Sequence, residues 1–318
     1  MSAATPAAVN ATALRPRARS WAQDLRANWP LYLMALPAVA AIIVFAYGPL
    51  FGLVVAFQDF SLFRGVWGSD WIGWANFQHA FSNSFFWTAL RNSLIISGLK
   101  LAIGYPTAII LALMLNEVRS RFFKGVVQTS TILPFFISWV VAGAMFRGLL
   151  APDGAFSEVQ TQLLHAPVSV ILSNPIAFRW VIIFQDTWKY AGYFAILYLA
   201  AMASIDPVLY EAAQVDGASR WQQTLHITLP GIASTMITLF VILVGYLVSA
   251  GFEQIYVMFN SSVYSTADIL ETFTLRLGLK QSDYGLATAV GMFQGVISLT
   301  LVTAANFVSR RVRHEGLF

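Results

Sequence analysis

Three things are scarce in this sequence: cysteine, charge and phosphate-binding loops. None of the 318 residues is cysteine, which excludes disulfide bonds and thiolate metal sites. Charged residues make up 11% of the chain, whereas a soluble domain carries about a quarter. The glycine-rich loop GxxxxGK[ST] does not occur, so the chain has no visible means of using ATP. Four scattered histidines show no ligand spacing, and no metal site is predicted.

Apolar sequence is abundant instead, at 58% of the chain. A helix needs about 20 apolar residues to cross the hydrocarbon core of a bilayer. The sequence therefore predicts an all-α membrane protein with six transmembrane helices within a domain covering 31–308. The predicted spans are 31–57, 88–115, 126–150, 176–203, 231–250 and 285–308. A tail over 1–30, in which Trp21–Trp29 can form an interfacial helix, and a basic tail over 309–318 flank them.

The placement of lysine and arginine predicts the orientation, because these residues are enriched in cytoplasmic loops. Arginines crowd residues 15–26, the loop 116–125 and the tail 309–318, and Arg220 lies in the segment 204–230. The opposite loops hold Arg64, Arg276 and Lys280. Both termini and the segment 204–230 are therefore predicted to be cytoplasmic. The net charge of +4 is modest, and nothing indicates a nucleic-acid partner.

The polar segment Ser204–Pro230 separates two predicted spans. Asp206 followed by proline predicts a helix start, because its side chain can accept from free N–H groups of the first turn. Pro207–Val215 then reads as a short helix. Asp216-Gly217 indicates a turn, since glycine tolerates the left-handed conformation that ends helices. Ala218–His226 reads as a second short helix, so the segment is predicted to be helix, turn, helix.

The same segment carries the spacing EAA-x2-DGA-x8-ITLP. A loop that merely caps two spans is the simpler interpretation, but this long string resembles the cytoplasmic coupling loop (EAA motif) of permease subunits in binding-protein-dependent ABC importers. In that family the loop seats in a cleft of the ATPase subunit. The resemblance assigns ATPase coupling to Glu211, Ala212, Ala213, Asp216, Gly217, Ala218, Ile227, Leu229 and Pro230.

Residues 92–141, 188–230 and the stretch from Gly251 onward resemble the branch of sugar-importer permeases for polysaccharide fragments, including one half of the alginate-importer pair. The resemblance implies a maltose-permease-like type I importer fold in a bacterial inner membrane. It also implies a heterodimer with a second homologous permease, two ATPase subunits and an extracytoplasmic solute-binding protein. This chain would form half of an alternating-access path for an oligo- or polysaccharide. It would be no enzyme and hold no cofactor, while the ATPase subunits bind ATP and Mg.

Polar side chains inside spans are candidates for the substrate path, because a charge at a helix centre costs about 2.5–3.5 kcal/mol on insertion scales. Sugars suit aromatic platforms joined to hydrogen-bonding groups. The candidates are Trp188, Lys189, Tyr190, Tyr246, Gln254, Tyr256 and Asn260, although helix packing explains such residues equally. Asp186 and Lys189 can pair on one helix face. Lys100 is expected to extend toward the interface or to face the partner permease.

Two other function classes remain as alternatives. An ion-coupled secondary sugar transporter would need buried carboxylates or unwound coordinating segments. Asp186 is the one clear carboxylate within a predicted span, and pairing with Lys189 gives it a neutral explanation. A membrane enzyme is disfavoured, because the sequence presents no Ser/His/Asp grouping, paired carboxylates or metal-ligand cluster.

Overall fold

A computed structural model describes residues 27–162, 165 and 170–313. The chain falls into two compact units, 1–52 and 53–318, and each is described by itself. The expected tail 1–20, most of the stretch Trp21–Trp29 and the end of the basic tail lie outside the described residues.

The first unit contains one long apolar helical run. Helix α2 (Trp29–Ile42) continues as the π-helical η1 (Ile43–Tyr47) and then as the 3-10 helix η2 (Gly48–Phe57), whose last residues belong to the second unit. The large apolar side chains of this run are exposed, among them Phe45 at 79% and Phe51 at 81%. Such a surface suits a helix whose solvent is lipid.

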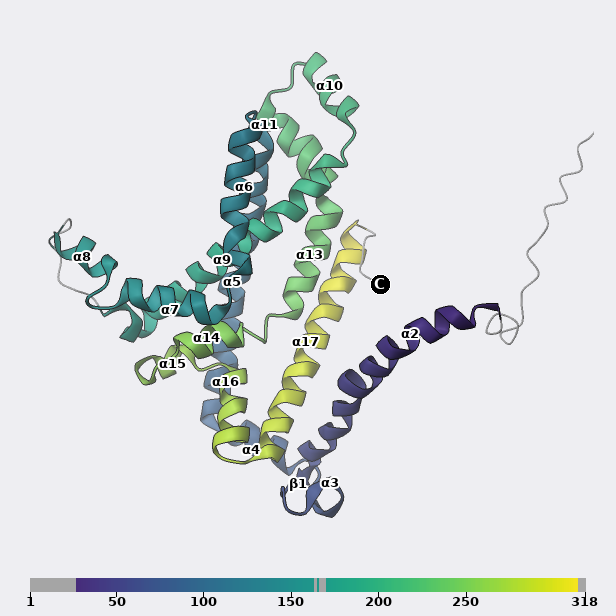
Figure 1. The fold of residues 1–318 in the computed structure, drawn as a ribbon, viewed down its shortest axis with the longest axis vertical. Helices are drawn as coiled ribbons and strands as arrows, with labels where there is room; N and C mark the ends of the chain where they lie inside the picture. The colour runs from purple at the N-terminus through teal and green to yellow at the C-terminus, as the bar shows by residue number, and fades with distance from the viewer. Residues whose placement is uncertain (1–26, 163–164, 166–169, 314–318) are drawn as a thin grey trace, which may run out of the picture. The chain divides into compact units, whose positions relative to one another are not determined.

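Among its described residues, the second unit consists of helices, connecting turns and one short hairpin, in which Gln58 pairs with Trp71 and Asp59 with Asp70. Its α-helices and strands run in chain order as β1 (Gln58–Asp59), α3 (Gly65–Gly68), β2 (Asp70–Trp71), α4 (Ala75–Ser82), α5 (Ser84–Glu117), α6 (Arg121–Phe136), α7 (Trp139–Leu150), α8 (Ala155–Gln162), α9 (Pro175–Ala203), α10 (Pro207–Val215), α11 (Arg220–Gln223), α12 (Leu229–Gly231), α13 (Ala233–Gly245), α14 (Phe252–Met258), α15 (Tyr264–Ala267), α16 (Leu270–Leu275) and α17 (Tyr284–Arg313). Short 3-10 or π-helical turns stand between them as η3 (Ile171–Ser173), η4 (Thr224–Thr228), η5 (Ser261–Val263) and η6 (Arg276–Lys280). Helices α10 and α11 lie at one end of this unit, and β1 and α4 lie at the other (Figure 1).

Three helices in the described chain are long and apolar enough to cross a membrane alone, and three bent pairs bring the number up to six. Six is the number predicted from the sequence. The span predicted over 126–150 is not a single helix, however, because α6 and the helical stretch Trp139–Gln162, which begins with α7, meet at 103°. Pro134 lies in the last turn of α6, and the hydroxyl of Ser138 caps α7 by accepting from the Val141 N–H. The cap starts a new helix where the old one ends.

Helices α5 and α9 pack along each other, and α6 packs on α9. At Gly192 the backbones of α9 and α6 nearly touch, because a Cβ built there would lie 2.1 Å from the Thr131 carbonyl oxygen. Ala108 and Ala112 of α5 and Ala195 of α9 are fully buried in the same region. Small residues that let helices approach closely are typical of packing within membranes.

Candidate functional site

The polar segment Ser204–Pro230 folds as the sequence predicts. Asp206 caps α10 by accepting from the Val208 N–H at 2.9 Å, and α10 covers Pro207–Val215. Gly217 is left-handed, with φ at 78°. The second helix differs in detail, because α11 starts at Arg220 and continues as the π-helical η4. Ser219 and Gln222 form a capping box there, which the S-x-x-Q spacing signals.

This segment presents an unpartnered surface. No residue of α10 is buried within the described chain, and Val208 and Val215 are 61% and 89% exposed. Glu211, Ala212 and Asp216 are exposed beside them. Exposed apolar side chains that lie together on a surface often mark a contact site for another protein. The exposed apolar and acidic side chains of α10 are suited to such a contact.

The other predicted coupling residues lie deeper or anchor the segment. Ala213, Ala218 and Ile227 are half-buried, and Leu229 packs against a core cluster between α5, α9 and α13. Gly217 and Pro230 are exposed.

Two contacts fix the segment to the rest of the chain. The Tyr210 hydroxyl lies 3.0 Å from the Thr228 hydroxyl, and Arg220 forms an ion pair with Glu117 at 2.7 Å. Glu117 is the last residue of α5. Through this pair the segment contacts a helix other than the two to which it is covalently joined.

A cavity of about 370 Å³ opens between α5, α7, α9 and the junction that connects α13 to α14. Its wall is largely apolar and aromatic and includes Tyr105, Trp139, Tyr190 and Phe194. Its polar residues include Ser97, Lys100, Asp186, Thr187, Tyr246 and Ser249. A cavity with apolar walls and few polar groups is the usual form of a small-molecule site.

Lys100 is the centre of the polar groups at this cavity. Its ammonium donates to the Ala250 carbonyl at 2.9 Å and to Gln254 Oε1 at 2.6 Å, and it pairs with Asp186 Oδ1 at 3.0 Å. Lys100 is 9% exposed. The expectation that it reaches the interface or a partner subunit is therefore wrong, because all three of these acceptors come from its own chain.

Lys189 does not pair with Asp186, so the expected pair on one face of α9 is wrong. Its ammonium donates to the carbonyls of Pro134 and Phe135, each at 3.1 Å, and to that of Ile137. These carbonyls lie where α6 ends, and a cation there offsets their partial negative charge. Lys189 holds the bend between α6 and α7 and is outside the cavity lining.

The remaining predicted path residues separate into two groups. Tyr190 and Tyr246 line the cavity. The others pack elsewhere: Gln254 is fully buried behind Lys100, Trp188 packs on Phe146, Tyr256 stacks on Phe252, and Asn260 donates to the Leu172 carbonyl. The sequence reasoning missed Trp139 and the Lys100–Asp186 pair. A lone lysine in an apolar run was the available signal, since such a charge needs a buried partner.

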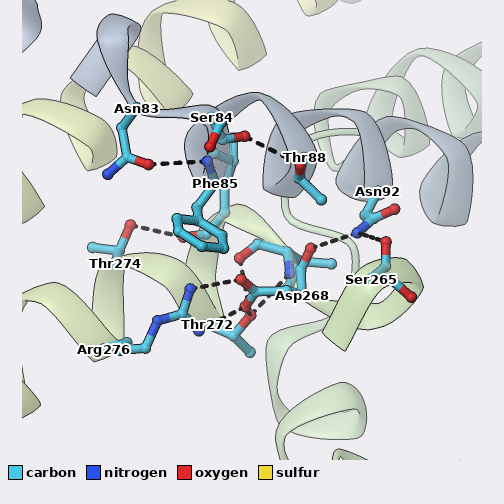
Figure 2. Close-up of polar contacts among 12 residues, drawn as sticks. Asn83, Ser84, Phe85, Thr88, Asn92, Ser265, Asp268, Thr272, Thr274 and Arg276 are labelled. Atoms are coloured by element: carbon cyan, nitrogen blue, oxygen red, sulfur yellow. Dashed lines mark hydrogen bonds and ion pairs between the residues drawn. The ribbon is translucent and has the colours of Figure 1, made fainter. Parts of the chain in front are cut away.

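An ion pair orders the stretch after α14, and the Asn92 side chain links this stretch to α5 (Figure 2). Asp268 is 3% exposed and accepts from Arg276 at 2.6 Å and from the Thr272 hydroxyl at 2.8 Å. The Asn92 amide of α5 donates to the backbone carbonyls of Asp268 and Ser265, both at 3.1 Å. Helices α15 and α16 are thereby held against α5.

The carboxyl group of Glu271 in α16 has fewer hydrogen bonds than that of Asp268. Its Oε1 lies 3.5 Å from the Gln294 amide, and its Oε2 is buried with no hydrogen-bond partner among the described residues. Burial raises the pKa of Glu271 to about 7. This carboxyl can therefore hold or release a proton near neutral pH.

A family model described as the inner membrane component of binding-protein-dependent transport systems matches residues 104–314. The chain belongs to this family. The segment Ser204–Pro230 and the whole cavity except Ser97, Lys100 and Leu101 lie in the matched part of this permease.

Relatives of the permease are similar over nearly the whole chain. Protein LplB of Bacillus subtilis (strain 168) is 39% identical over 300 residues, covering 94% of each chain. The polygalacturonan/rhamnogalacturonan transport system permease protein YteP of the same organism is 40% identical over 288 residues, covering 91% of this chain and 90% of YteP.

Two solved structures share the fold of the permease. One is a chain of a bacterial ABC transporter involved in the import of the acidic polysaccharide alginate, with a TM-score of 0.85 and 40% identity, covering 91% of this chain and 98% of that one. The other is a chain of a bacterial alginate ABC transporter in complex with alginate pentasaccharide-bound periplasmic protein, with a TM-score of 0.87 and 38% identity, covering 94% and 100%. The permease is thus a membrane subunit of a sugar ABC importer, with the type I fold and without an ATPase site of its own.

Proposed function

We propose that this permease forms, together with a second homologous permease, the alternating-access path for an acidic oligo- or polysaccharide across a bacterial inner membrane, with alginate as the preferred cargo. The observation that carries the proposal is the similarity to two alginate-importer chains over at least 91% of the sequence. YteP is named for polymers of the same acidic kind. Membership of the ABC permease family favours this function over an ion-coupled transporter.

The cavity suits a sugar in its chemistry. Trp139 and Tyr190 provide aromatic faces for the apolar faces of a sugar ring, and the hydroxyls of Ser97 and Tyr246 provide hydrogen-bonding groups for its edges. Cargo would arrive from an extracytoplasmic solute-binding protein. Both termini and the segment Ser204–Pro230 would lie in the cytoplasm, as the arginine placement predicts.

The segment Ser204–Pro230 would couple the permease to an ATPase subunit, of which the importer contains two. The uncovered face of α10 supports this assignment, as does the EAA-x2-DGA-x8-ITLP spacing. ATP and Mg would be bound by the ATPase subunits, and this chain would contribute no cofactor. ATP-driven closure would then move the segment together with α9 and α13, which border the cavity.

Uptake by the reconstituted importer tests the proposed cargo. The permease, its partner permease, the ATPase subunits and the binding protein would be placed in liposomes, and uptake of alginate, polygalacturonate and neutral malto-oligosaccharides would be compared. We expect ATP-dependent uptake of alginate oligosaccharides above the other two. Uptake that prefers neutral oligosaccharides, or that proceeds without ATPase subunits, would refute the proposal.

Glu211→Lys tests the coupling assignment. Glu211 is exposed on α10, so the variant should insert and assemble normally while transport per ATP hydrolysed is lost. Gln214→Lys is the matched control, because it places a lysine on the same exposed helix at a position that the motif leaves unspecified. Wild-type transport by Glu211→Lys, or equal losses in both variants, would count against the assignment.

A further inference from the structure

The three hydrogens of the Lys100 ammonium have three acceptors, and each comes from a different part of the described chain. The Ala250 carbonyl belongs to the junction between α13 and α14, Gln254 belongs to α14, and Asp186 belongs to α9. An ammonium has three donors and no acceptor. Lys100 is therefore fully used, and it joins α5 to three other places at once.

The junction that Lys100 contacts has an unusual backbone. Ala250 and Gly251 are both left-handed, with φ at 50° and 82°. This conformation is sparsely populated for a residue with a Cβ, so it persists only where the surroundings hold it. A Cβ built on Gly251 would lie 2.9 Å from the Lys100 Nζ. The ammonium thus packs directly against the junction and is positioned to hold it.

The three acceptors of Lys100 differ in how exposed they are to a molecule in the cavity. Ala250 is 3% exposed and Gln254 is fully buried, and the Gln254 amide is fixed in turn by the Ile182 carbonyl at 2.7 Å and by Gln185 at 3.1 Å. Asp186 is 21% exposed and lines the cavity, whereas Ala250, which also borders the cavity, is almost fully covered. Of the three contacts, the one to Asp186 is therefore the most open to competition from a molecule in the cavity.

We propose that Lys100 is a positioning residue that ties occupancy of the cavity to the α13–α14 junction, and that a carboxylate of the cargo replaces Asp186 as its third acceptor. The identity of the cargo rests on the proposed function. A carboxylate is the same chemical group as the Asp186 side chain, so the exchange keeps the ammonium paired. The two buried contacts keep Lys100 on the junction while its third partner changes.

The chain offers a direct route from this junction to the coupling segment. Helix α13 ends at Gly245, just before the junction, and its other end follows α12 and η4 of the segment Ser204–Pro230. A change at the junction therefore acts on the end of a helix that begins in the coupling segment.

Amide hydrogen exchange of the assembled importer without cargo tests the hold on the junction. Lys100→Met removes two buried charge-assisted hydrogen bonds, so exchange over residues 246–258 should rise about tenfold or more. Asp186→Asn keeps the Ala250 and Gln254 contacts and should change this exchange by less than about threefold. Equal exchange in the two variants would overturn the proposal.

Transport tests the exchange of acceptors. In Asp186→Asn no carboxylate competes for Lys100, so the concentration of cargo-loaded binding protein that gives half-maximal uptake should fall about tenfold. In Lys100→Met the ATP hydrolysed per molecule transported should rise. A higher half-saturating concentration in Asp186→Asn, or wild-type coupling in Lys100→Met, would contradict the proposal.

Two further measurements keep the outcomes separable. Lys100→Met leaves Asp186 without its partner, so the double variant Lys100→Met/Asp186→Leu, which removes both charges, decides the case if the single variant does not assemble. It too should show faster exchange over 246–258. An importer that moves no acidic sugar would refute the proposed function. The amide hydrogen exchange over residues 246–258 would still decide whether Lys100 holds the junction.

Discussion

Two of the interruptions in the apolar helices of the permease have their hydrogen-bonding groups paired in opposite ways. In the segment Ser204–Pro230 the caps are local: Asp206 binds an N–H two residues away, and Ser219 binds one three residues away. At the α13–α14 junction the partners are distant, since Lys100 lies 150 residues from Ala250. The segment whose helix caps come from neighbouring residues is left uncovered and can contact another protein. The junction whose hydrogen-bond partner is distant in the sequence is buried and belongs to the interior of the permease.

Substitutions should therefore have unequal consequences in the two regions. A change in the exposed segment loses a cap or a backbone preference, worth about 1 kcal/mol in each case. A change among the buried helices leaves a charge or a backbone group unpaired or forces helices apart, and such losses reach about 3–5 kcal/mol. Four substitutions, each with a control, test this difference between the exposed segment and the buried helices.

The largest effect is expected for Gly192→Ala in α9. Its Cβ would lie 2.1 Å from the Thr131 carbonyl oxygen, and backbone cannot yield as a side chain does, so α6 and α9 must separate. We expect the folded permease to be lost or destabilised by more than about 3 kcal/mol, as measured by thermal unfolding in detergent. Gly98→Ala in α5 is the control, because no described atom lies within 4 Å of its added Cβ. Equal stability of the two variants would show that α6 and α9 are not in backbone contact.

The next effect is expected for Asp268→Ala, which leaves the Arg276 guanidinium in a largely buried site without its carboxylate. Breaking a buried pair from one side costs about 3 kcal/mol. Asp70→Ala removes a carboxylate from an exposed pair with Arg64 and should cost less than about 1 kcal/mol. The free energy of unfolding of both variants in denaturant gives the comparison, and equal losses would remove the distinction between the buried and exposed pairs.

The two regions also differ in how far the sequence predicts them. Helix α10, the cap at Asp206 and the left-handed Gly217 follow from residues within a few positions of one another, and the structure confirms them. The six-helix pattern is predicted in the same way, because each run of apolar residues is also a local feature of the sequence.

The interior could not be predicted in this way. No residue near Lys100 in the sequence indicates that Asp186 is its partner, because the ion pair forms only when α5 and α9 pack together. The sequence instead favoured Lys189, which is three residues from Asp186 but donates to the carbonyls that end α6. The bend at Ser138 was missed since the apolar run continues across it. Partner choice for a buried charge depends on helix packing, which local spacing does not encode.

A smaller effect is expected for Gly217→Val in the exposed segment. Gly217 has φ at 78° and no described atom within 4 Å of an added Cβ, so the cost is that of the left-handed backbone, about 1–2 kcal/mol. The permease should fold, but the second short helix should be misdirected, and less ATPase subunit should co-purify. Gly125→Val in α6 has the same open surroundings and an ordinary φ, and it should bind the ATPase subunit normally. Normal co-purification and ATPase stimulation in Gly217→Val would mean that the turn does not direct the docking surface.

The smallest effect is expected for Glu271→Gln, and it appears in the pH dependence of stability. Burial raises the pKa of Glu271 from 4.5 to about 7, so the folded permease binds a proton that the unfolded chain has released, and stability falls as the pH rises from about 4.5 to about 7. The glutamine variant cannot ionise, so its melting temperature should fall less than that of the wild type over this window and exceed it above about pH 7. Glu253→Gln, which changes an exposed carboxylate on α14, is the matched control, and the profile of Glu271→Gln should differ from it. If Glu271→Gln follows the wild-type profile, burial does not keep the proton on Glu271, and this carboxyl is already charged in the folded permease.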